Sequence, residues 1–321
     1  LALVCKMEKL LNGVLEIYRR VNMGTQRSSL AKQRRHSTRI AATVFLLPAL
    51  IILFVFIAYP IVDSFRISLL EWNGISSEQR YIGLENWKNL LQDSSFWHAF
   101  KNNLLVMALS LLIQLPTAMA LATFLDIGGK KLNFFKVVYF LPLLMSSVAV
   151  GFLFKYALSP NTGIITAISK AFGGPAIDLL GNPKYAIYAV IGVICWQYIP
   201  FYMVYFLAAY SGLSYEIYEA SIIDGATRSQ YFWRIALPCM KGAIQSAAIL
   251  SMVGSLKYFD LIHVMTGGGP GNATELMATY MYKNAFVTYK MGYGSTVASG
   301  MFILITSISF IVMKLLRGKE E

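Results

Sequence analysis

Residues 214–238 read Ser-Tyr-Glu-Ile-Tyr-Glu-Ala-Ser-Ile-Ile-Asp-Gly-Ala-Thr-Arg-Ser-Gln-Tyr-Phe-Trp-Arg-Ile-Ala-Leu-Pro, a polar interruption in a very apolar chain. Ser214 is a favourable N-cap, and Glu216 and Glu219 follow in the first turns, where the helix dipole favours acids. Gly225 permits a sharp turn, after which residues 231–235 predict a second short helix that Pro238 stops or kinks. The stretch therefore predicts two short helices joined by a glycine elbow.

The composition around this stretch is that of a membrane protein. The chain has 321 residues, of which 56% are hydrophobic and 14% charged, whereas soluble domains carry about 25% charged residues. A helix needs about 20 apolar residues to cross a bilayer. Six runs meet this length, at Ala41–Val62, Asn103–Leu125, Phe135–Leu158, Tyr185–Tyr210, Gly242–Met265 and Tyr293–Leu316. The fold class predicted is an all-α membrane protein whose six-span domain covers residues 41–316.

The distribution of basic residues predicts how these spans are oriented. With the N-terminus inside, 18 of the 28 Lys and Arg residues fall on inner segments, as the positive-inside bias requires. Residues 1–40 are then a basic cytoplasmic segment, residues 317–321 a cytoplasmic tail, and the glycine elbow is cytoplasmic. The net charge of +12 does not indicate a nucleic-acid partner, because the basic residues flank apolar spans and form no face interleaved with aromatic residues.

The residues of the elbow resemble the EAA loop of ABC importer permeases, which docks into a groove on a cytoplasmic ATPase. Ser221 and Lys241 depart from that pattern, in which Ala and Pro are usual. The resemblance implies that the ATPase-coupling residues are Glu219, Ala220, Asp224, Gly225, Ala226, Phe232, Ile235 and Pro238.

Segments predicted to lie outside the membrane resemble the carbohydrate branch of this family. They are Tyr81–Trp87 with Phe96-Trp97, the glycine loop Thr266–Thr274, and the run Ala278–Tyr282 with Ala285-Phe286. The resemblance implies the type I importer permease fold in a bacterial plasma membrane. It also implies a second permease subunit, two ATPase subunits and an extracytoplasmic sugar-binding protein as partners. The chain has no Walker motif, so we expect no cofactor in it, and ATP with Mg to bind to the ATPase.

Polar side chains inside the spans are candidates for the substrate pathway, because such groups usually face a bundle interior or a water-filled cavity. The fourth span offers Gln197, Tyr198 and Phe201 on nearly one face, and the fifth offers Ser251, Ser255 and Tyr258 along one predicted stripe. Hydroxyls, an amide and aromatic faces suit a neutral polyol. The resemblance to the maltose-type permease places sugar contacts at the same positions.

Structural explanations remain open for these candidates. Serines in membrane helices often serve only close packing, and tyrosines often lie at the membrane interface. Lys257 and Asp260 are three residues apart and could form an ion pair, for which we favour a structural role over ligand binding.

Two other functions are open to an apolar chain of this kind, those of a secondary transporter or channel and of a membrane enzyme. A self-contained secondary transporter or channel predicts intramembrane acids and internal repeats, but only Asp260 is deep enough and no repeat is visible. A membrane enzyme predicts clustered carboxylates or histidines, whereas His36, His98 and His263 are scattered, and the three cysteines are too dispersed for a metal site.

Overall fold

The computed structural model describes residues 43–317, and these residues are mostly helical. The chain divides into two compact units, Leu1–Asp63 and Ser64–Glu321. In the first unit a helix begins at Thr43 and includes the π-helical turn η1 (Phe54–Ala58). It continues as α2 (Tyr59–Ile67), whose last residues belong to the second unit. The predicted segment 1–40 lies outside the described residues.

The second unit contains one short antiparallel strand pair and a series of helices. The strands β1 (Leu70–Glu71) and β2 (Arg80–Tyr81) pair with Leu70 opposite Tyr81. The first helical elements are α3 (Glu85–Gln92), α4 (Ser94–Gly128), the 3-10 turn η2 (Gly129–Leu132), α5 (Asn133–Leu144), α6 (Ser147–Ala157), α7 (Ile164–Ala171) and α8 (Ala186–Ser211). They are followed by α9 (Tyr215–Ile223), α10 (Arg228–Tyr231), the π turn η3 (Phe232–Ala236), α11 (Leu237–Cys239), α12 (Lys241–Ser255), α13 (Asp260–Met265), α14 (Met277–Tyr282), the π turn η4 (Lys283–Val287) and α15 (Met291–Arg317).

Four described helices are long and apolar enough to cross a membrane, and the number rises to six if two bent helix pairs each count as one span. Four of the predicted spans correspond to these long helices, which are Thr43–Ile67, Ser94–Asp126, Ala186–Ser211 and Met291–Leu315. The all-α membrane class is thus confirmed, while the third and fifth predicted spans need correction.

The third predicted span, Phe135–Leu158, is not one straight helix. It is bent by 95° between α5 and α6. The backbone is extended at Met145 and Ser146, just after Pro142. Pro142 itself lies inside α5, because proline perturbs the helical turn that precedes it and not the one that follows.

The fifth predicted span, Gly242–Met265, is also broken. Helix α12 ends at Ser255, and α13 begins only at Asp260. A helix end inside a bundle leaves carbonyl groups that a neighbour must satisfy. Asn103 of α4 supplies such a partner, because its Nδ2 donates to the Leu256 carbonyl at 3.3 Å. This break decides the position of residues 256–259.

Long helices pack along one another in the centre of the second unit. Helix α4 contacts α8 along much of its length, and α12 packs against both α4 and α15. The fully buried Ala118 and Ala122 of α4 share one apolar cluster with Met203 and Phe206 of α8. Small residues at helical spacing allow this close approach of membrane helices.

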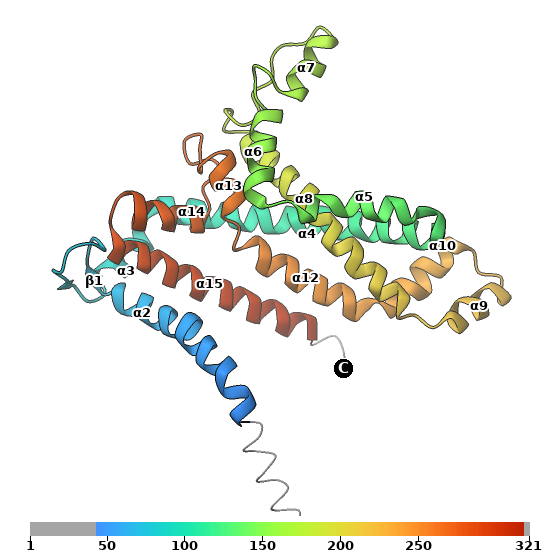
Figure 1. The fold of residues 1–321 in the computed structure, drawn as a ribbon, viewed down its shortest axis with the longest axis horizontal. Coiled ribbons are helices and arrows are strands. Elements are labelled where there is room, and N and C mark those ends of the chain that lie inside the picture. The colour runs from blue at the N-terminus through green and yellow to red at the C-terminus, as the bar shows by residue number, and fades with distance from the viewer. Residues whose placement is uncertain (1–42, 318–321) are drawn as a thin grey trace, which may run out of the picture. The chain divides into compact units, whose positions relative to one another are not determined.

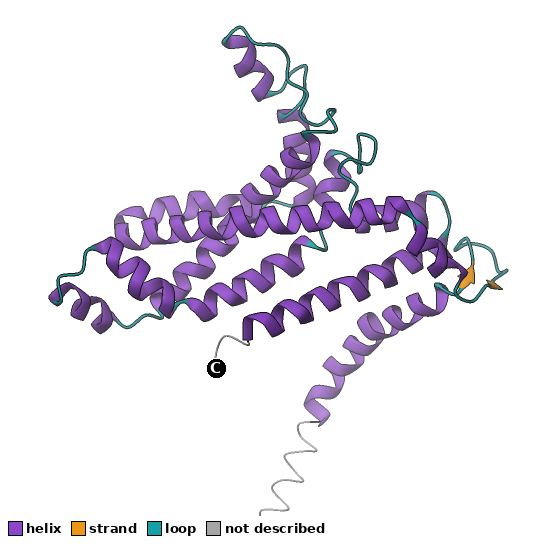
Figure 2. Ribbon diagram, turned by 180° about the vertical axis from the view of Figure 1, so that it is seen from behind, coloured by secondary structure: helices purple, strands orange, loops and turns teal. Residues whose placement is uncertain are grey.

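The strand pair and α9 lie at opposite ends of the second unit (Figures 1 and 2). The predicted outer loop and the glycine elbow are therefore separated by the length of the long helices. Large apolar side chains are exposed on those helices, for example Phe124, Phe134 and Phe310, which is the pattern expected of a surface that faces lipid or another subunit.

Candidate coupling surface and transport cavity

The elbow has the local geometry that its sequence predicts. The Ser214 side chain accepts a hydrogen bond from the Glu216 amide at 3.3 Å and caps α9. Gly225 follows α9 with a φ of +78°, a conformation that costs glycine little and other residues more. Thr227 and Gln230 form a reciprocal capping box at the start of α10. Two short helices with a glycine elbow are thus confirmed.

The second helix of the elbow begins earlier than predicted, at Arg228. The helical path continues from α10 through η3 into α11, and Pro238 lies inside it. The path bends by 68° before α12, next to Met240. The path ends at Cys239, one residue after Pro238, so the prediction that Pro238 stops or kinks this helix is confirmed.

The predicted coupling residues divide into an exposed tip and a packed base. Glu219, Ala220, Asp224, Gly225 and Pro238 are exposed, whereas Ala226, Phe232 and Ile235 are half-buried. The neighbouring Ile223 is 84% exposed at the end of α9. The exposed tip therefore carries two acids, Glu219 and Asp224, and an exposed isoleucine, all before the glycine turn.

The base of the elbow is tied to the long helices by aromatic contacts. The rings of Tyr218 and Tyr231 meet edge to face at 5.0 Å and join α9 to α10. Phe232 and Tyr231 pack against the apolar cluster that includes Phe206 and Met240. Displacement of the tip would therefore be transmitted to α8 and α12 through packed side chains.

A cavity of about 400 Å³ lies between α5, α8 and the break that follows α12, within the range of about 300–1,000 Å³ that is usual for ligand pockets. Three of the six predicted substrate residues line it, namely Tyr198, Phe201 and Tyr258. The Tyr198 and Tyr258 rings are 5.4 Å apart and inclined by 45°. The structure thus brings aromatic residues from two predicted spans together at one cavity.

The other three predicted substrate residues are buried beside the cavity. Gln197 is 2% exposed, and its Nε2 donates to the Met145 carbonyl at 3.3 Å. Ser255 donates to the Ser251 carbonyl at 2.7 Å. The predicted single stripe through Ser251, Ser255 and Tyr258 is wrong, because α12 ends at Ser255 and helical spacing no longer applies at Tyr258. The assignment of these residues to the substrate pathway stays a prediction.

The expected ion pair between Lys257 and Asp260 does not form in the described part of the chain. Both residues are exposed, and both line the cavity. Neither side chain has an ion-pair or hydrogen-bond partner among residues 43–317. The expectation assumed three residues of continuous helix, and the break before α13 removes that spacing.

Residues 114–319, which include the elbow and the cavity, match the family described as the binding-protein-dependent transport system inner membrane component. The chain belongs to this family. The permease is 33% identical over 291 residues to the probable ABC transporter permease protein YurN of Bacillus subtilis, with 89% of this chain and 99% of the relative covered.

Another relative and a solved structure extend the comparison. The permease is 31% identical over 279 residues to the multiple sugar-binding transport system permease protein MsmF of Streptococcus mutans, with 86% of this chain and 95% of the relative covered. Its fold resembles a chain in the crystal structure of a bacterial ABC transporter that imports the acidic polysaccharide alginate, with a TM-score of 0.78 and 25% identity. That match covers 91% of this permease and 99% of the solved chain.

A buried polar cluster behind the cavity was missed in the sequence. Gln114 of α4 is fully buried, and its Oε1 accepts from Ser251 at 3.4 Å. The Nε2 of Gln114 has no hydrogen-bond acceptor among the described residues. Gln114 lies in a predicted span, so the rule used for the fourth and fifth spans would have indicated it.

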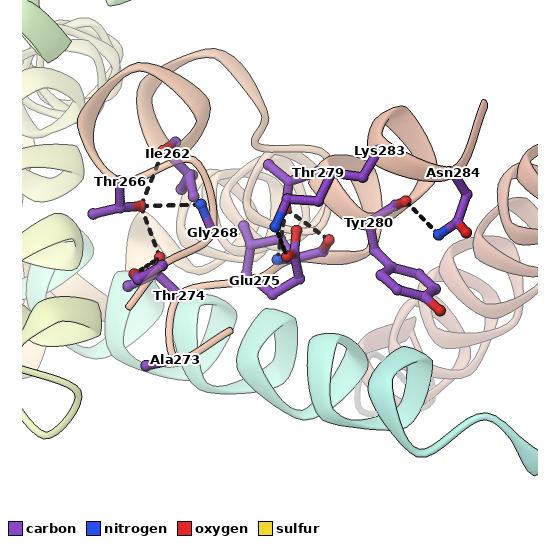
Figure 3. Close-up of polar contacts among 12 residues, drawn as sticks. Ile262, Thr266, Gly268, Ala273, Thr274, Glu275, Thr279, Tyr280, Lys283 and Asn284 are labelled. Atoms are coloured by element: carbon purple, nitrogen blue, oxygen red, sulfur yellow. Dashed lines mark hydrogen bonds and ion pairs between the residues drawn. The ribbon is translucent and has the colours of Figure 1, made fainter. Parts of the chain in front are cut away.

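The glycine loop is stabilised by its own hydrogen bonds (Figure 3) and by two asparagines of α4. The hydroxyls of Thr266 and Thr274 are 2.7 Å apart, and Thr274 also donates to the Gly269 carbonyl. The following residue, Glu275, is buried and forms an ion pair with Lys283. Asn102 of α4 donates to the carbonyls of Ala273 and Glu275, and Asn103 accepts from the Met277 amide. The loop is thus anchored to α4 and to the end of α14.

Proposed function

We propose that this permease forms the translocation pathway for a carbohydrate. The observation that carries the proposal is the cavity lined by Tyr198, Phe201 and Tyr258, in a chain related to a multiple sugar-binding transport permease and similar in fold to an alginate importer. Aromatic faces stack on the C–H surfaces of sugar rings, and polar groups beside them bind hydroxyls. The transported substrate is a di- or oligosaccharide, or a related polyol, which is delivered to the cytoplasmic side.

The elbow is proposed to couple the pathway to a separate ATPase. The support is geometric, since an exposed tip at Asp224 and Gly225 stands on a base that packs into the long helices. ATP binding can shift a conformational equilibrium only if it favours one state over the other. Closure of the ATPase pair on ATP would move the tip and so favour one conformation of the permease over the other. ATP and Mg would be bound by the ATPase.

The assembly proposed contains a second permease subunit, two ATPase subunits and an extracytoplasmic sugar-binding protein. The dependence on a binding protein is part of the description of the family. Both termini are proposed to be cytoplasmic, on the charge distribution of the sequence. The opposite placement of the strand pair and α9 is compatible with this orientation (Figure 1).

Uptake by the complete assembly tests the proposed function. The permease is expressed with its partner permease, ATPase and binding protein, and uptake of a panel of radiolabelled sugars is measured with an active or a hydrolysis-deficient ATPase. We expect saturable uptake of at least one sugar only with the active ATPase. Uptake that persists without ATP hydrolysis would support a secondary transporter, and no uptake of any sugar would reject carbohydrate as the substrate.

A further inference from the structure

We propose that Lys257 and Asp260 make the cavity selective for uncharged oligosaccharides and unfavourable for sugars that carry a carboxylate. The inference rests on the proposed function, because it assigns a substrate class to the same cavity. It also departs from the alginate importer, whose cargo is acidic.

The break between α12 and α13 brings the two charges to the cavity. Residues 256–259 leave the helix, so Lys257, Tyr258 and Asp260 all line the same space. The remaining lining residues are Leu143, Ser147, Tyr198, Phe201, Tyr202, Leu250, Gly254, Phe259 and Leu261. Within the described chain, the cavity therefore carries one positive and one negative side chain and no other charge.

Neither charge is satisfied by the protein. Lys257 and Asp260 have no side-chain hydrogen-bond or ion-pair partner among the described residues, and both are exposed, so water or a ligand must bond to them. The buried Glu275 shows the contrast, because it is paired with Lys283. The two cavity charges are thus available to a ligand that replaces their water.

An uncharged sugar can satisfy both charges at once. A hydroxyl both donates and accepts, whereas an ammonium only donates and a carboxylate only accepts. Neighbouring hydroxyls of one sugar can therefore donate to Asp260 and accept from Lys257, while Tyr198 and Tyr258 provide ring faces. Hydrogen bonds to ionised groups are about twice as strong as those between neutral groups.

A sugar that carries a carboxylate is both attracted and repelled by charges of the same cavity. Its carboxylate would pair with Lys257 but would lie beside Asp260, only three residues away along the chain. Like charges brought together in a binding site repel and serve to exclude wrong ligands. The net charge of the lining is zero, so nothing compensates a second anion.

Direct binding to the purified assembly, without the binding protein, isolates the contribution of the cavity. The permease–ATPase complex is trapped with ATP and vanadate, and equilibrium dialysis measures dissociation constants for malto-, cello- and xylo-oligosaccharides of two to five units. Each neutral sugar is paired with a counterpart that carries one uronic acid. The variants are Asp260→Asn, Lys257→Met and, as a control away from the cavity, Lys170→Met on α7. Gel filtration confirms assembly of each variant.

We expect wild-type protein to bind its best neutral sugar roughly tenfold or more tighter than the acidic counterpart, the scale of one charged hydrogen bond. Asp260→Asn should bring the two affinities to within about threefold, Lys257→Met should weaken the neutral sugar roughly tenfold, and Lys170→Met should change neither. Equal or tighter binding of acidic sugars by wild type, or unchanged selectivity in Asp260→Asn, would overturn the inference and leave carbohydrate transport standing. Failure of all sugars to bind and to be taken up would instead reject the proposed function.

Discussion

Asp93 shows how one carboxylate joins three helices. It caps α4 by accepting hydrogen bonds from the amides of Ser95 and Phe96 at 2.9 and 3.4 Å. Its other oxygen accepts from the hydroxyls of Tyr280 in α14 and Tyr293 in α15. Burial by itself raises the pKa of Asp93, but these four hydrogen bonds together outweigh it and lower the pKa below its ordinary value of 3.8.

This lowered pKa predicts a specific pH dependence of stability. The folded protein holds the ionised form better than the unfolded chain, so the contribution is complete above pH 3.8 and is lost as the pH falls through the folded-state pKa. Melting temperatures of detergent-purified protein between pH 3 and 7 measure it. Asp93→Asn should remove part of the acid dependence, while Glu78→Gln in the exposed strand connection should keep it. Identical profiles for wild type and Asp93→Asn would contradict the assignment.

Tyr258 tests the aromatic contribution to the cavity. Removal of its ring by Tyr258→Ala eliminates the contact with Tyr198 and one face for a sugar ring. Aromatic pairs contribute about 0.5–1.5 kcal/mol, so the apparent KM for uptake should rise roughly two- to tenfold. Tyr258→Phe keeps the ring and should show a smaller change. An unaltered KM in Tyr258→Ala, with normal assembly, would remove this residue from the substrate pathway.

The elbow can be tested as an element through Gly225. Its φ of +78° disfavours residues with a branched Cβ, while open space surrounds the position where a Cβ would lie. Gly225→Val should therefore distort the elbow through the backbone alone, at a cost of about 1–2 kcal/mol. Gly225→Asn should be tolerated, because asparagine adopts this conformation more readily.

The readout for Gly225 is the coupling of ATP hydrolysis to uptake in the intact assembly. We expect Gly225→Val to lower transport per ATP hydrolysed and Gly225→Asn to stay close to wild type. Glu219→Lys should also reduce coupling, because it reverses a charge at the exposed tip. Full coupling in both Gly225→Val and Glu219→Lys would show that the elbow is not the contact with the ATPase.

The glycine loop offers a matched pair of substitutions. Gly268 and Gly271 both have positive φ, +87° and +55°, so alanine strains the backbone at each. A Cβ at Gly268 would also lie 2.6–2.8 Å from the Glu275 carboxylate, whereas a Cβ at Gly271 meets open space. Glu275 is buried and paired with Lys283 and has little room to move (Figure 3). Gly268→Ala should cost about 1–3 kcal/mol more than Gly271→Ala.

Thermal melting of the two glycine variants measures this difference. A lower melting temperature for Gly268→Ala than for Gly271→Ala is the expected result. Equal melting temperatures would mean that Glu275 can leave its position without loss of stability, and the ion pair with Lys283 would then not anchor the loop.

At the scale of the whole molecule, the orientation in the membrane is the main prediction. Ile223 at the end of α9 and Ser76 between the strands are both exposed. Helix α9 and the strand pair lie at opposite ends of the second unit (Figure 1). In a background with the three native cysteines replaced, Ser76→Cys should react with an impermeant maleimide in spheroplasts. Ile223→Cys should react only in inverted vesicles. The reverse pattern would place the elbow outside and rule out a cytoplasmic ATPase contact there.

Local patterns predicted much of this protein correctly. Hydropathy indicated the membrane class, and Ser214, Gly225 and the acids of α9 indicated the elbow, because caps and glycine turns depend on neighbours in the chain. The breaks at Met145 and after Ser255 were not predicted. A hydropathy window measures how apolar a segment is, and it does not report where a continuous apolar run changes direction.

The amino-acid sequence by itself indicated the family, the apolar segments and the glycine elbow, since each depends on residue types at short, regular spacing. Only the tertiary structure decided which polar residues face the cavity. Helical spacing predicts a shared face only while the helix continues, and α12 ends at Ser255. Beyond that point, packing against Asn103 of α4 positions the chain, so Ser251 became buried and Lys257 and Asp260 reached the cavity separately.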